Sequence, residues 1–286
     1  MLEIHSIAVL GAGVMGRGIA QVAAQSGYDT TLIDVTADIL SDALTAIKSS
    51  LKKGVEKGKI TEEAMIGALT RIELDDQLER GVASADFVIE ALPERIDLKI
   101  AMLRRVHGAT KAGAILATNT SALSVTEIGA GSGRPERVVG MHFFNPVPIM
   151  RLVEIIRGLE SGADALEAAV GVARAMGKET VEVRESPGFV TSRMNALIGN
   201  EAFRMLEEGI ASAEEIDRAL KLGLNHPMGP FELVDLVGLD TRLSILEYLH
   251  ASLGERFRPT PLMVQYVKAG RLGRKVGRGV YDYRGK

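Results

Sequence analysis

The sequence contains no cysteine. Its absence excludes disulfide bonds, thiol catalysis and cysteine-ligated metal centres. No apolar run reaches the roughly 18–20 residues that a membrane-spanning helix needs. There is also no excess of positive charge, because 34 lysines and arginines stand against 37 acidic residues, for a net charge of −3. Nucleic acids and membrane surfaces attract a concentrated positive field, so we expect neither as a partner.

The composition is that of an ordinary globular protein. The 286 residues are 46% hydrophobic and 25% charged, which excludes intrinsic disorder and provides enough apolar material for a core. This length suits one large domain or two of average size. The first residues show no basic region, long apolar core and small-residue cleavage site of a secretory signal, so a cytoplasmic location is expected.

The first forty residues carry a nucleotide-binding pattern. An apolar run at 7–10 predicts a strand, the apolar spacing after Gly13 predicts a helix, and 30–33 predicts a second strand. The motif between the first strand and the helix is Gly11-Ala12-Gly13-Val14-Met15-Gly16. Asp34 ends the second strand, eighteen positions after Gly16. Strand, glycine turn, helix, strand and acid therefore stand in the order that a dinucleotide site requires.

Each of these residue types has a physical function at such a site. Gly11 allows the tight turn, Gly13 lets a pyrophosphate approach the backbone, and Gly16 lets helix and strand pack closely. The helix N-terminus offers N–H groups and a positive dipole end to the phosphates. Asp34 can accept hydrogen bonds from both ribose hydroxyls of NAD and would repel the 2′-phosphate of NADP. The pattern therefore predicts NAD as the cofactor.

The remaining chain predicts an α/β protein with a helical end. Alternating strands and helices up to residue 186 indicate a parallel, doubly wound sheet of the Rossmann type, covered on both faces. After the break at residues 185–188 we expect an all-α domain. The predicted domains are therefore 1–186, which binds NAD, and 187–286. The further strands are expected at 87–89, 115–117, 138–141, 152–156 and 180–183, and the C-terminal helices at 189–208, 213–222, 240–253 and 260–270.

A lysine-rich flank lies on the helix predicted over 38–58. Ser50, Lys53 and Lys57 project from it. Such a cluster is usually a solvated face. The alternative is an anion site for a phosphorylated ligand, and the residues by themselves leave both interpretations open.

Polar residues follow the apolar strands at the edge where open α/β sheets bind ligands. Glu90 and Glu94 flank the end of one strand, and Asn119 and Ser121 follow the next. Taken singly, these are ordinary loop and helix-capping residues. No H-E-x-x-H or paired-acid pattern is present, so no metal is expected.

His142 ends the apolar run 138–141, and Glu154 lies twelve residues later inside the apolar run 152–156. A carboxylate in an apolar strand is costly unless it has a partner. If the turn between them brings the two strands together, Glu154 can bind one nitrogen of His142, and the other can accept a proton from a substrate hydroxyl. Proton removal coupled to hydride transfer to NAD would oxidise an alcohol. The alternative is a structural His–Glu hydrogen bond.

Together these segments resemble the 3-hydroxyacyl-CoA dehydrogenases, and most closely the short bacterial enzymes acting on 3-hydroxybutyryl-CoA. The resemblance covers nearly the whole chain, and its most specific segments begin at His142 and Asn225. It is carried by GAGVMGRGIA, VIEALPE, ATNTSALSVTEI, GMHFFNPVPIMRLVEII, ESPGFVTSR, LGLNHPMGPFELVDLVGLD and GRLGRKVGRGVYDY.

The resemblance implies a role for each matching residue. His142 would be the catalytic base, oriented by Glu154, and Ser121 would bind the 3-oxygen of the substrate next to the nicotinamide. The acyl-CoA substrate would contact Ser50 and Lys57, which favours the phosphate interpretation of the lysine flank. The C-terminal domain would supply one wall of the acyl pocket and a homodimer interface. Direct contacts to NAD would come from Glu94, Lys99, Asn145 and Lys275.

One departure from the family pattern concerns the substrate carbonyl. Many members carry Asn-Arg after Pro-Gly-Phe-Val, whereas this chain has Thr191-Ser192-Arg193. Losing a donor to a developing oxyanion can lower the rate by ~10²–10³. Either Ser192 substitutes as a shorter donor, or Asn195 replaces it in part, or turnover is slower.

Two alternative functions share the predicted architecture. One is a dehydrogenase of a hydroxy acid without CoA, as in the gulonate dehydrogenases. The other is a non-catalytic NAD-binding structural protein, like the lens crystallins that borrowed this fold, and the intact set of Ser121, His142 and Glu154 argues against it.

Overall fold

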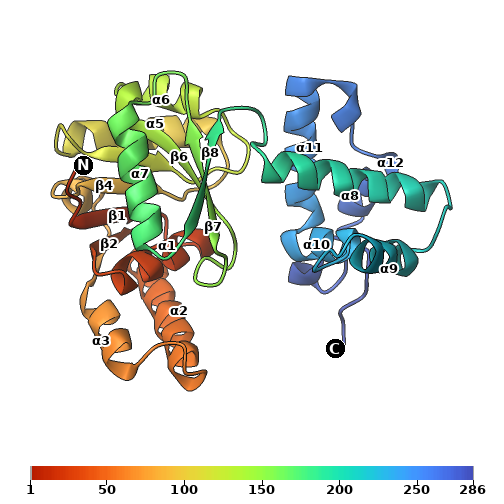
Figure 1. Cartoon of the computed structure of the whole chain (residues 1–286), viewed down its shortest axis with the longest axis horizontal. Coiled ribbons are helices and arrows are strands. Elements are labelled where there is room, and N and C mark those ends of the chain that lie inside the picture. Colours follow the sequence, from red (N-terminus) through yellow and green to blue (C-terminus); the bar gives the residue numbers. More distant parts are fainter. Residues whose placement is uncertain (1, 286) are drawn as a thin grey trace. The chain divides into compact units, whose positions relative to one another are not determined.

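The computed structural model describes residues 2–285. The chain divides into two compact units, Met1–Ser186 and Pro187–Lys286. The first contains a sheet flanked by helices, and the second is helical (Figure 1). This is the expected class, a Rossmann-type α/β unit followed by a helical domain. No helix among the described residues is long and apolar enough to span a membrane.

The first unit is built on one eight-stranded sheet with the order β3-β2-β1-β4-β5-β6-β7-β8. Neighbouring strands from β3 to β6 run parallel. The strands are β1 (Ser6–Leu10), β2 (Asp29–Ile33), β3 (Ile72–Asp75), β4 (Phe87–Glu90), β5 (Ile115–Thr118), β6 (Val138–Phe143), β7 (Leu152–Arg157) and β8 (Glu179–Arg184).

Two features of this sheet go beyond the prediction. Strand β7 runs antiparallel to β6, because only residues 144–151 join them and a parallel crossover needs a dozen residues or more. Strand β3 was not predicted. Its four residues are partly or fully exposed, so it lacks the apolar run that marks the central strands.

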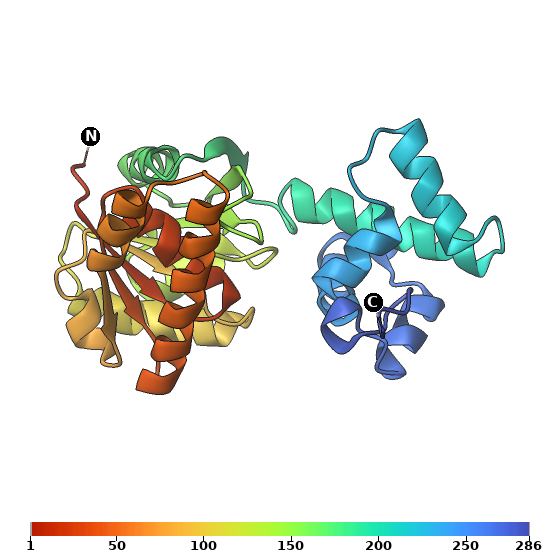
Figure 2. The same cartoon turned by 90° about the horizontal axis from the view of Figure 1, so that it is seen from below.

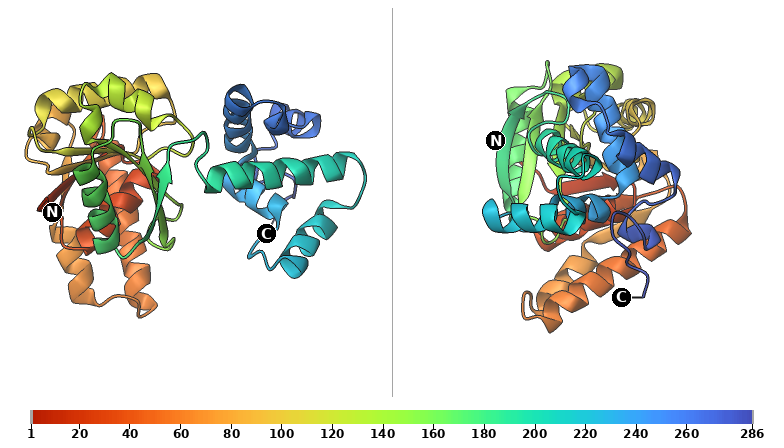
Figure 3. Two further views of the ribbon diagram at one scale, coloured as in Figure 1. Left: turned by 45° about the horizontal axis from the view of Figure 1, so that its top comes forward. Right: turned by 90° about the vertical axis from the view of Figure 1, so that its right-hand side faces the viewer.

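Helices cover both faces of the sheet (Figure 3). Alternate strand residues such as Val9, Ile89 and Ala117 share one apolar core with α1, α2 and α7. Their neighbours Val88 and Leu116 are equally buried on the opposite face, where α5 packs against α6. The helices are α1 (Val14–Gln25), α2 (Ala37–Glu56), α3 (Glu62–Thr70), α4 (Leu78–Val82), α5 (Ile96–Ala109), α6 (Val125–Ser132) and α7 (Ala163–Ala175).

The second unit is built from helices (Figure 2), and its buried apolar residues form a core of their own. Phe203 packs edge-on against Phe231 and Tyr266, with ring centroids 5.2 and 5.8 Å away. Helix α10 lies between two predicted helices and was not itself predicted. Pro230 occupies its first position, where proline favours helix initiation. The helices are α8 (Thr191–Glu207), α9 (Ala213–Gly223), α10 (Pro230–Val237), α11 (Leu239–Leu253) and α12 (Pro261–Lys268).

Two buried aspartates fasten the C-terminal segment to this helical unit. Asp217 in α9 accepts a hydrogen bond from the hydroxyl of Tyr281 at 2.8 Å. Asp235 in α10 accepts from the backbone N–H groups of Val280 and Tyr281 and from the hydroxyl of Tyr283. The segment that carries Lys275 is therefore held at its far end by side chains of α9 and α10.

Candidate active site

The glycine motif forms the turn between β1 and α1. Gly11 has a φ of +93°, a conformation that favours glycine, and its N–H donates to the carbonyl of Ile33 at 2.8 Å. A Cβ on Gly16 would lie 1.7 Å from the carbonyl oxygen of Gly11, whereas one on Gly13 would meet nothing within 4 Å. Gly16 is therefore required by packing, and Gly13 leaves open space at the N-terminus of α1.

Asp34 connects the end of β2 to this glycine turn. One carboxylate oxygen accepts from the N–H of Ala12 at 2.6 Å, and the other accepts from the N–H of Val35 at 2.7 Å. The acid is only partly buried. It therefore lies beside the turn, as a residue recognising the ribose of a bound dinucleotide should.

A buried ion pair lies beneath the carboxyl ends of β4 and β5. Lys99 and Glu90 are both fully buried, with 2.7 Å between the ammonium and a carboxylate oxygen. Glu90 also accepts from the hydroxyl of Thr118 and the N–H of Leu92. The ammonium donates to the carbonyls of Leu92 and Asn119 as well. Burial raises the pKa of Glu90, although the Lys99 ammonium opposes that shift.

A residue that contacts a cofactor directly needs some exposed surface, and Lys99 lies instead in a buried environment. Its side chain has no exposed surface, and its hydrogen bonds fix two adjacent strand ends. Contact between Lys99 and NAD stays a prediction, while the structure supports a positioning role.

Glu94 organises the loop that carries Ser121. One of its carboxylate oxygens accepts from the hydroxyl of Thr120 at 2.6 Å and from the N–H groups of Ser121 and Ala122. Its other oxygen lies 3.7 Å from the Lys99 ammonium. Glu94 therefore fixes the backbone at Ser121 while its own side chain remains partly exposed.

His142 and Glu154 face each other across the antiparallel strands β6 and β7. The Nδ1 atom of His142 lies 2.7 Å from a carboxylate oxygen of Glu154, and both side chains are almost fully buried. The ring of Phe144 packs against the imidazole, with centroids 4.4 Å apart. Since a carboxylate on Nδ1 favours the tautomer with a basic Nε2, the pair can perform acid–base chemistry.

Asn119, the residue that follows β5, connects this pair to the buried ion pair. The side-chain oxygen of Asn119 accepts from the N–H of Phe143 at 3.0 Å, and its backbone oxygen accepts from Lys99. The strand ends that carry Ser121 and His142 are therefore joined by direct hydrogen bonds. Asn119 had been predicted as an ordinary loop residue, and only the packed sheet reveals this role.

The other predicted site residues lie on separate elements. Asn145 is exposed in the connection between β6 and β7, and Ser50 and Lys57 lie at the C-terminal end of α2. In the second unit, Ser192 is 9% exposed in the first turn of α8. Lys275 contacts both carboxylate oxygens of Asp240 at 2.6 Å.

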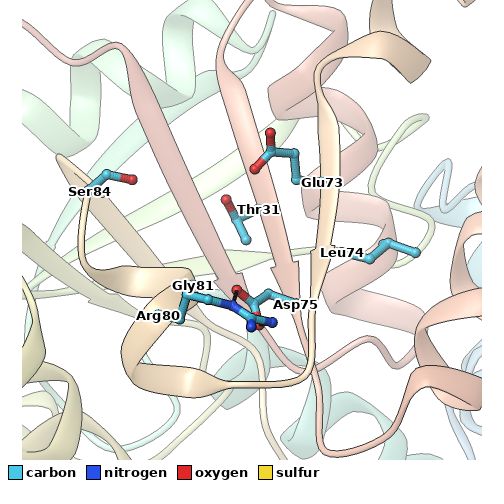
Figure 4. A pocket seen from close by; sticks show the side chains of 7 residues that line it. All are labelled: Thr31, Glu73, Leu74, Asp75, Arg80, Gly81 and Ser84. Carbon is cyan, nitrogen blue, oxygen red and sulfur yellow. Dashed lines mark hydrogen bonds and ion pairs between the residues drawn. The ribbon is translucent and has the colours of Figure 1, made fainter.

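A polar cavity of about 460 Å³ lies at the β3 edge of the sheet (Figure 4). Two of its charged groups, Arg80 and Asp75, neutralise each other through two hydrogen bonds of 2.6 and 2.8 Å. None of the predicted site residues lines this cavity, so it is not part of the candidate active site. Its lining residues are Thr31, Glu73, Leu74, Asp75, Arg80, Gly81 and Ser84.

Sequence reasoning missed two polar residues that organise this region. Thr118 ends the apolar strand β5 and supports Glu90. Lys178 follows α7 and is buried with its ammonium against backbone carbonyls. The position of Thr118 at the end of a strand was a weak indication that it belongs to the site. Lys178 follows a glycine, and nothing in that pattern indicates burial.

A Rossmann-type sheet with this glycine turn, an acid beside the turn and a buried His–Glu pair is an arrangement typical of an NAD-dependent dehydrogenase. The profile described as "3-hydroxyacyl-CoA dehydrogenase, NAD binding domain" matches residues 6–186, and that of the "C-terminal domain" matches residues 188–283. The chain therefore belongs to the 3-hydroxyacyl-CoA dehydrogenase family, a family of NAD-dependent oxidoreductases, and its cofactor is NAD.

Relatives match the chain over its full length. A probable 3-hydroxybutyryl-CoA dehydrogenase of Bacillus subtilis is 47% identical over 100% of this chain and 99% of that protein. The crystal structure of (S)-3-hydroxybutyryl-CoA dehydrogenase PaaH1 from Ralstonia eutropha has a TM-score of 0.94 at 42% identity, covering 98% of this chain and 99% of that one. For FadB2 of M. tuberculosis the TM-score is 0.95 at 35% identity, with 99% and 100% covered.

Proposed function

We propose that the protein oxidises (S)-3-hydroxyacyl-CoA, with 3-hydroxybutyryl-CoA as its preferred substrate, to 3-oxoacyl-CoA in a reversible reaction. The observation that carries this proposal is the buried contact of 2.7 Å between His142 and Glu154. His142 lies on β6, the strand next to the one that leads to Ser121. Several relatives, including those of Bacillus subtilis and Bradyrhizobium diazoefficiens, are named as 3-hydroxybutyryl-CoA dehydrogenases.

The residues around the glycine turn suit NAD. The close contact between Gly11 and Gly16 and the open space at Gly13 shape the turn for a pyrophosphate at the N-terminus of α1. Asp34 would bind the adenosine ribose, and Glu94 and Asn145 the nicotinamide end. When bound, NAD accepts the hydride from C3 of the substrate.

His142 moves the proton of this reaction. Its Nε2 accepts the proton from the 3-hydroxyl group during oxidation and returns it during reduction. The carboxylate of Glu154 stabilises the imidazolium that forms and keeps the ring oriented. Ser121 donates a hydrogen bond to the same substrate oxygen. Ser192 would supply a shorter hydroxyl donor to the substrate in place of the asparagine common in the family.

The CoA portion would bind at the end of α2. Ser50 and Lys57 are seven positions apart, two helical turns, and so lie on one face. Lys57 is exposed and has no ion-pair partner among residues 2–285. A hydroxyl and an ammonium in this arrangement suit a phosphate group of CoA.

The test is NADH formation followed by absorbance with four substrates at equal concentration. These are (S)-3-hydroxybutyryl-CoA, its six-carbon homologue, free 3-hydroxybutyrate and gulonate. We expect rapid NADH formation with the CoA esters only, fastest with the four-carbon ester, and inhibition by free CoA.

Other outcomes would identify the alternatives. Turnover of gulonate without inhibition by CoA would replace the proposal with a dehydrogenase of hydroxy acids. NADH binding without turnover of any substrate would favour a non-catalytic protein. The first assignment in doubt would then be Ser192 as a substitute for the usual asparagine.

Asp34→Ser should weaken the preference for NAD. The change removes a charged acceptor for the ribose hydroxyls, so kcat/KM for NAD should fall about 10–100-fold. It also removes the repulsion of a 2′-phosphate, so kcat/KM for NADP should rise. Steady-state kinetics with both cofactors measure this ratio. Asp38→Ser, at an exposed acid in the first turn of α2, is the matched control, and an unchanged ratio in Asp34→Ser would contradict the assignment.

We also propose a homodimer formed through the second unit. This unit exposes apolar side chains, among them Leu222, Ile210 and Met194 at 76, 63 and 55% exposure. Light scattering should give about twice the 30.6 kDa mass of one chain. A concentration-independent monomer would contradict this proposal.

A further inference from the structure

The connection between β6 and β7 is a packed structure although most of its residues are exposed. It turns at Pro146, whose carbonyl accepts from the N–H groups of Ile149 and Met150 at 3.0 Å. Val147 points inward and is only 2% exposed. A Cβ on Gly18 of α1 would lie 3.0 Å from the Cβ of Val147, so this helix position accommodates the turn closely.

Lys178 holds the same turn from the other side. It is 7% exposed, in the segment between α7 and β8. Its ammonium donates to the carbonyl of Val147 at 2.5 Å and to the carbonyl of Met150 at 2.9 Å. The two carbonyls lie at either end of the Val147–Met150 segment, so one side chain sets the shape of the turn.

This arrangement is unusual for a lysine. Its ammonium forms no salt bridge with an acidic side chain among residues 2–285, and burial lowers its pKa. Buried lysines normally have an acidic partner, because desolvating a charge is costly. Here only backbone oxygens compensate the charge. An apolar residue at this position would fold without that cost but would leave two carbonyls of the turn unfixed.

We propose that Lys178 is a positioning residue for the cofactor, acting through the turn that carries Asn145. One of the two carbonyls that it binds belongs to Val147. Val147 comes two residues after Asn145, which is exposed at the start of the turn. Fixing Val147 between Lys178 and α1 holds the Asn145 amide where the nicotinamide end of NAD would meet it. The inference rests on the proposed contact between Asn145 and NAD.

The effect should be separable from proton transfer. His142 and Glu154 are held by the ladder between β6 and β7, in which Phe143 pairs with Val153 and Met141 with Ile155. The hydrogen bonds of the Lys178 ammonium go to the turn between these strands, to the carbonyls of Val147 and Met150. Its removal should therefore alter how the nicotinamide is held and leave the acid–base pair in place.

The test compares two ligands, NADH and ADP-ribose, in calorimetric titrations of the full chain. ADP-ribose contains the adenosine and the pyrophosphate but no nicotinamide. With Lys178→Met, which keeps length and apolar volume, NADH should bind about tenfold more weakly, as expected for one positioned hydrogen bond, and ADP-ribose less than about twofold more weakly. Equal losses for both ligands, or no loss for either, would overturn the proposal.

A matched control separates positioning from general loss of stability. Val172→Ala shortens a buried side chain of α7, 2% exposed, and removes no hydrogen bond to the turn. It should lower the melting temperature and leave the ratio of the two dissociation constants unchanged. If Val172→Ala changed the ratio as much as Lys178→Met, the selectivity would reflect stability alone and the proposal would fail.

Combining variants tests the route of the effect. Asn145→Ala should show the same selective loss for NADH, and the double variant should lose no more than either single variant, because both act on one contact. Additive losses would overturn the route through Asn145. A loss with Asn145→Ala and none with Lys178→Met would overturn only the role of Lys178. No loss with Asn145→Ala would remove the proposed cofactor contact itself.

Discussion

His142→Gln is expected to lower kcat for (S)-3-hydroxybutyryl-CoA by about 10²–10⁴-fold, the usual contribution of a general base. Glutamine keeps a polar side chain of similar length next to Glu154 but cannot take up the proton at neutral pH. NADH should still bind with nearly its original affinity, because the glycine turn and Asp34 are untouched. Stopped-flow absorbance and NADH titration measure the two quantities separately.

His107→Gln is the matched control for this variant. His107 lies in α5, with its Nδ1 atom 3.0 Å from the carbonyl of Ser132, away from the strand ends that carry the candidate site. The His107→Gln variant should retain the turnover of the unchanged protein. Near-normal kcat in His142→Gln would show that another group takes the proton, and an equal loss in both variants would indicate a general structural effect.

Lys99→Met is expected to give the largest loss of stability, about 3–5 kcal/mol in the free energy of unfolding at pH 7. The substitution leaves Glu90 buried without the ammonium that lies 2.7 Å away. Lys111→Met is the matched control, since Lys111 pairs with Asp86 at 2.6 Å but is 51% exposed. An exposed pair contributes about 0–1 kcal/mol. Urea unfolding followed by circular dichroism compares the two variants.

The stability lost in Lys99→Met should also depend on pH. Burial already raises the pKa of Glu90 in the folded protein, and the Lys99 ammonium opposes this shift, so its removal raises that pKa further. A carboxyl group with a raised folded pKa binds its proton more readily when folded than when unfolded. The deficit should therefore shrink as the pH falls from 7 to 5. A deficit independent of pH, or one below that of Lys111→Met, would contradict the role of this ion pair.

The central part of the fold could be predicted because its signals are local. Parallel strands that are buried on both faces consist of nearly continuous apolar runs. The buried strands between β1 and β6 show this pattern in the sequence. Strand β3 escaped prediction because only four partly exposed residues form it. The direction of β7 also escaped prediction, since it depends on the path of the chain between residues 144 and 151 rather than on composition.

The candidate site was predictable where the chemistry itself is unusual. Glu154 places a carboxylate inside an apolar strand and therefore needs a partner. In the structure that partner is His142, whose Nδ1 atom lies 2.7 Å from the carboxylate. Lys99 and Lys178 show the opposite case. A lysine in a helix or after a glycine is normally solvated, and nothing nearby in sequence indicates that these two are buried. Their partners Glu90, Asn119 and Met150 come from other elements.

The sequence by itself determined the class of protein and its cofactor, and it predicted the contact between His142 and Glu154. Glycine spacing, a strand-ending acid and polar residues within apolar runs are local consequences of backbone geometry and of the cost of burying charge. Tertiary structure decided the pairing direction of β7, the burial of the Lys99–Glu90 ion pair and the contact of Lys178 with the turn after His142. These features depend on which segments the packed sheet brings together, and that depends on the whole core rather than on any stretch of sequence.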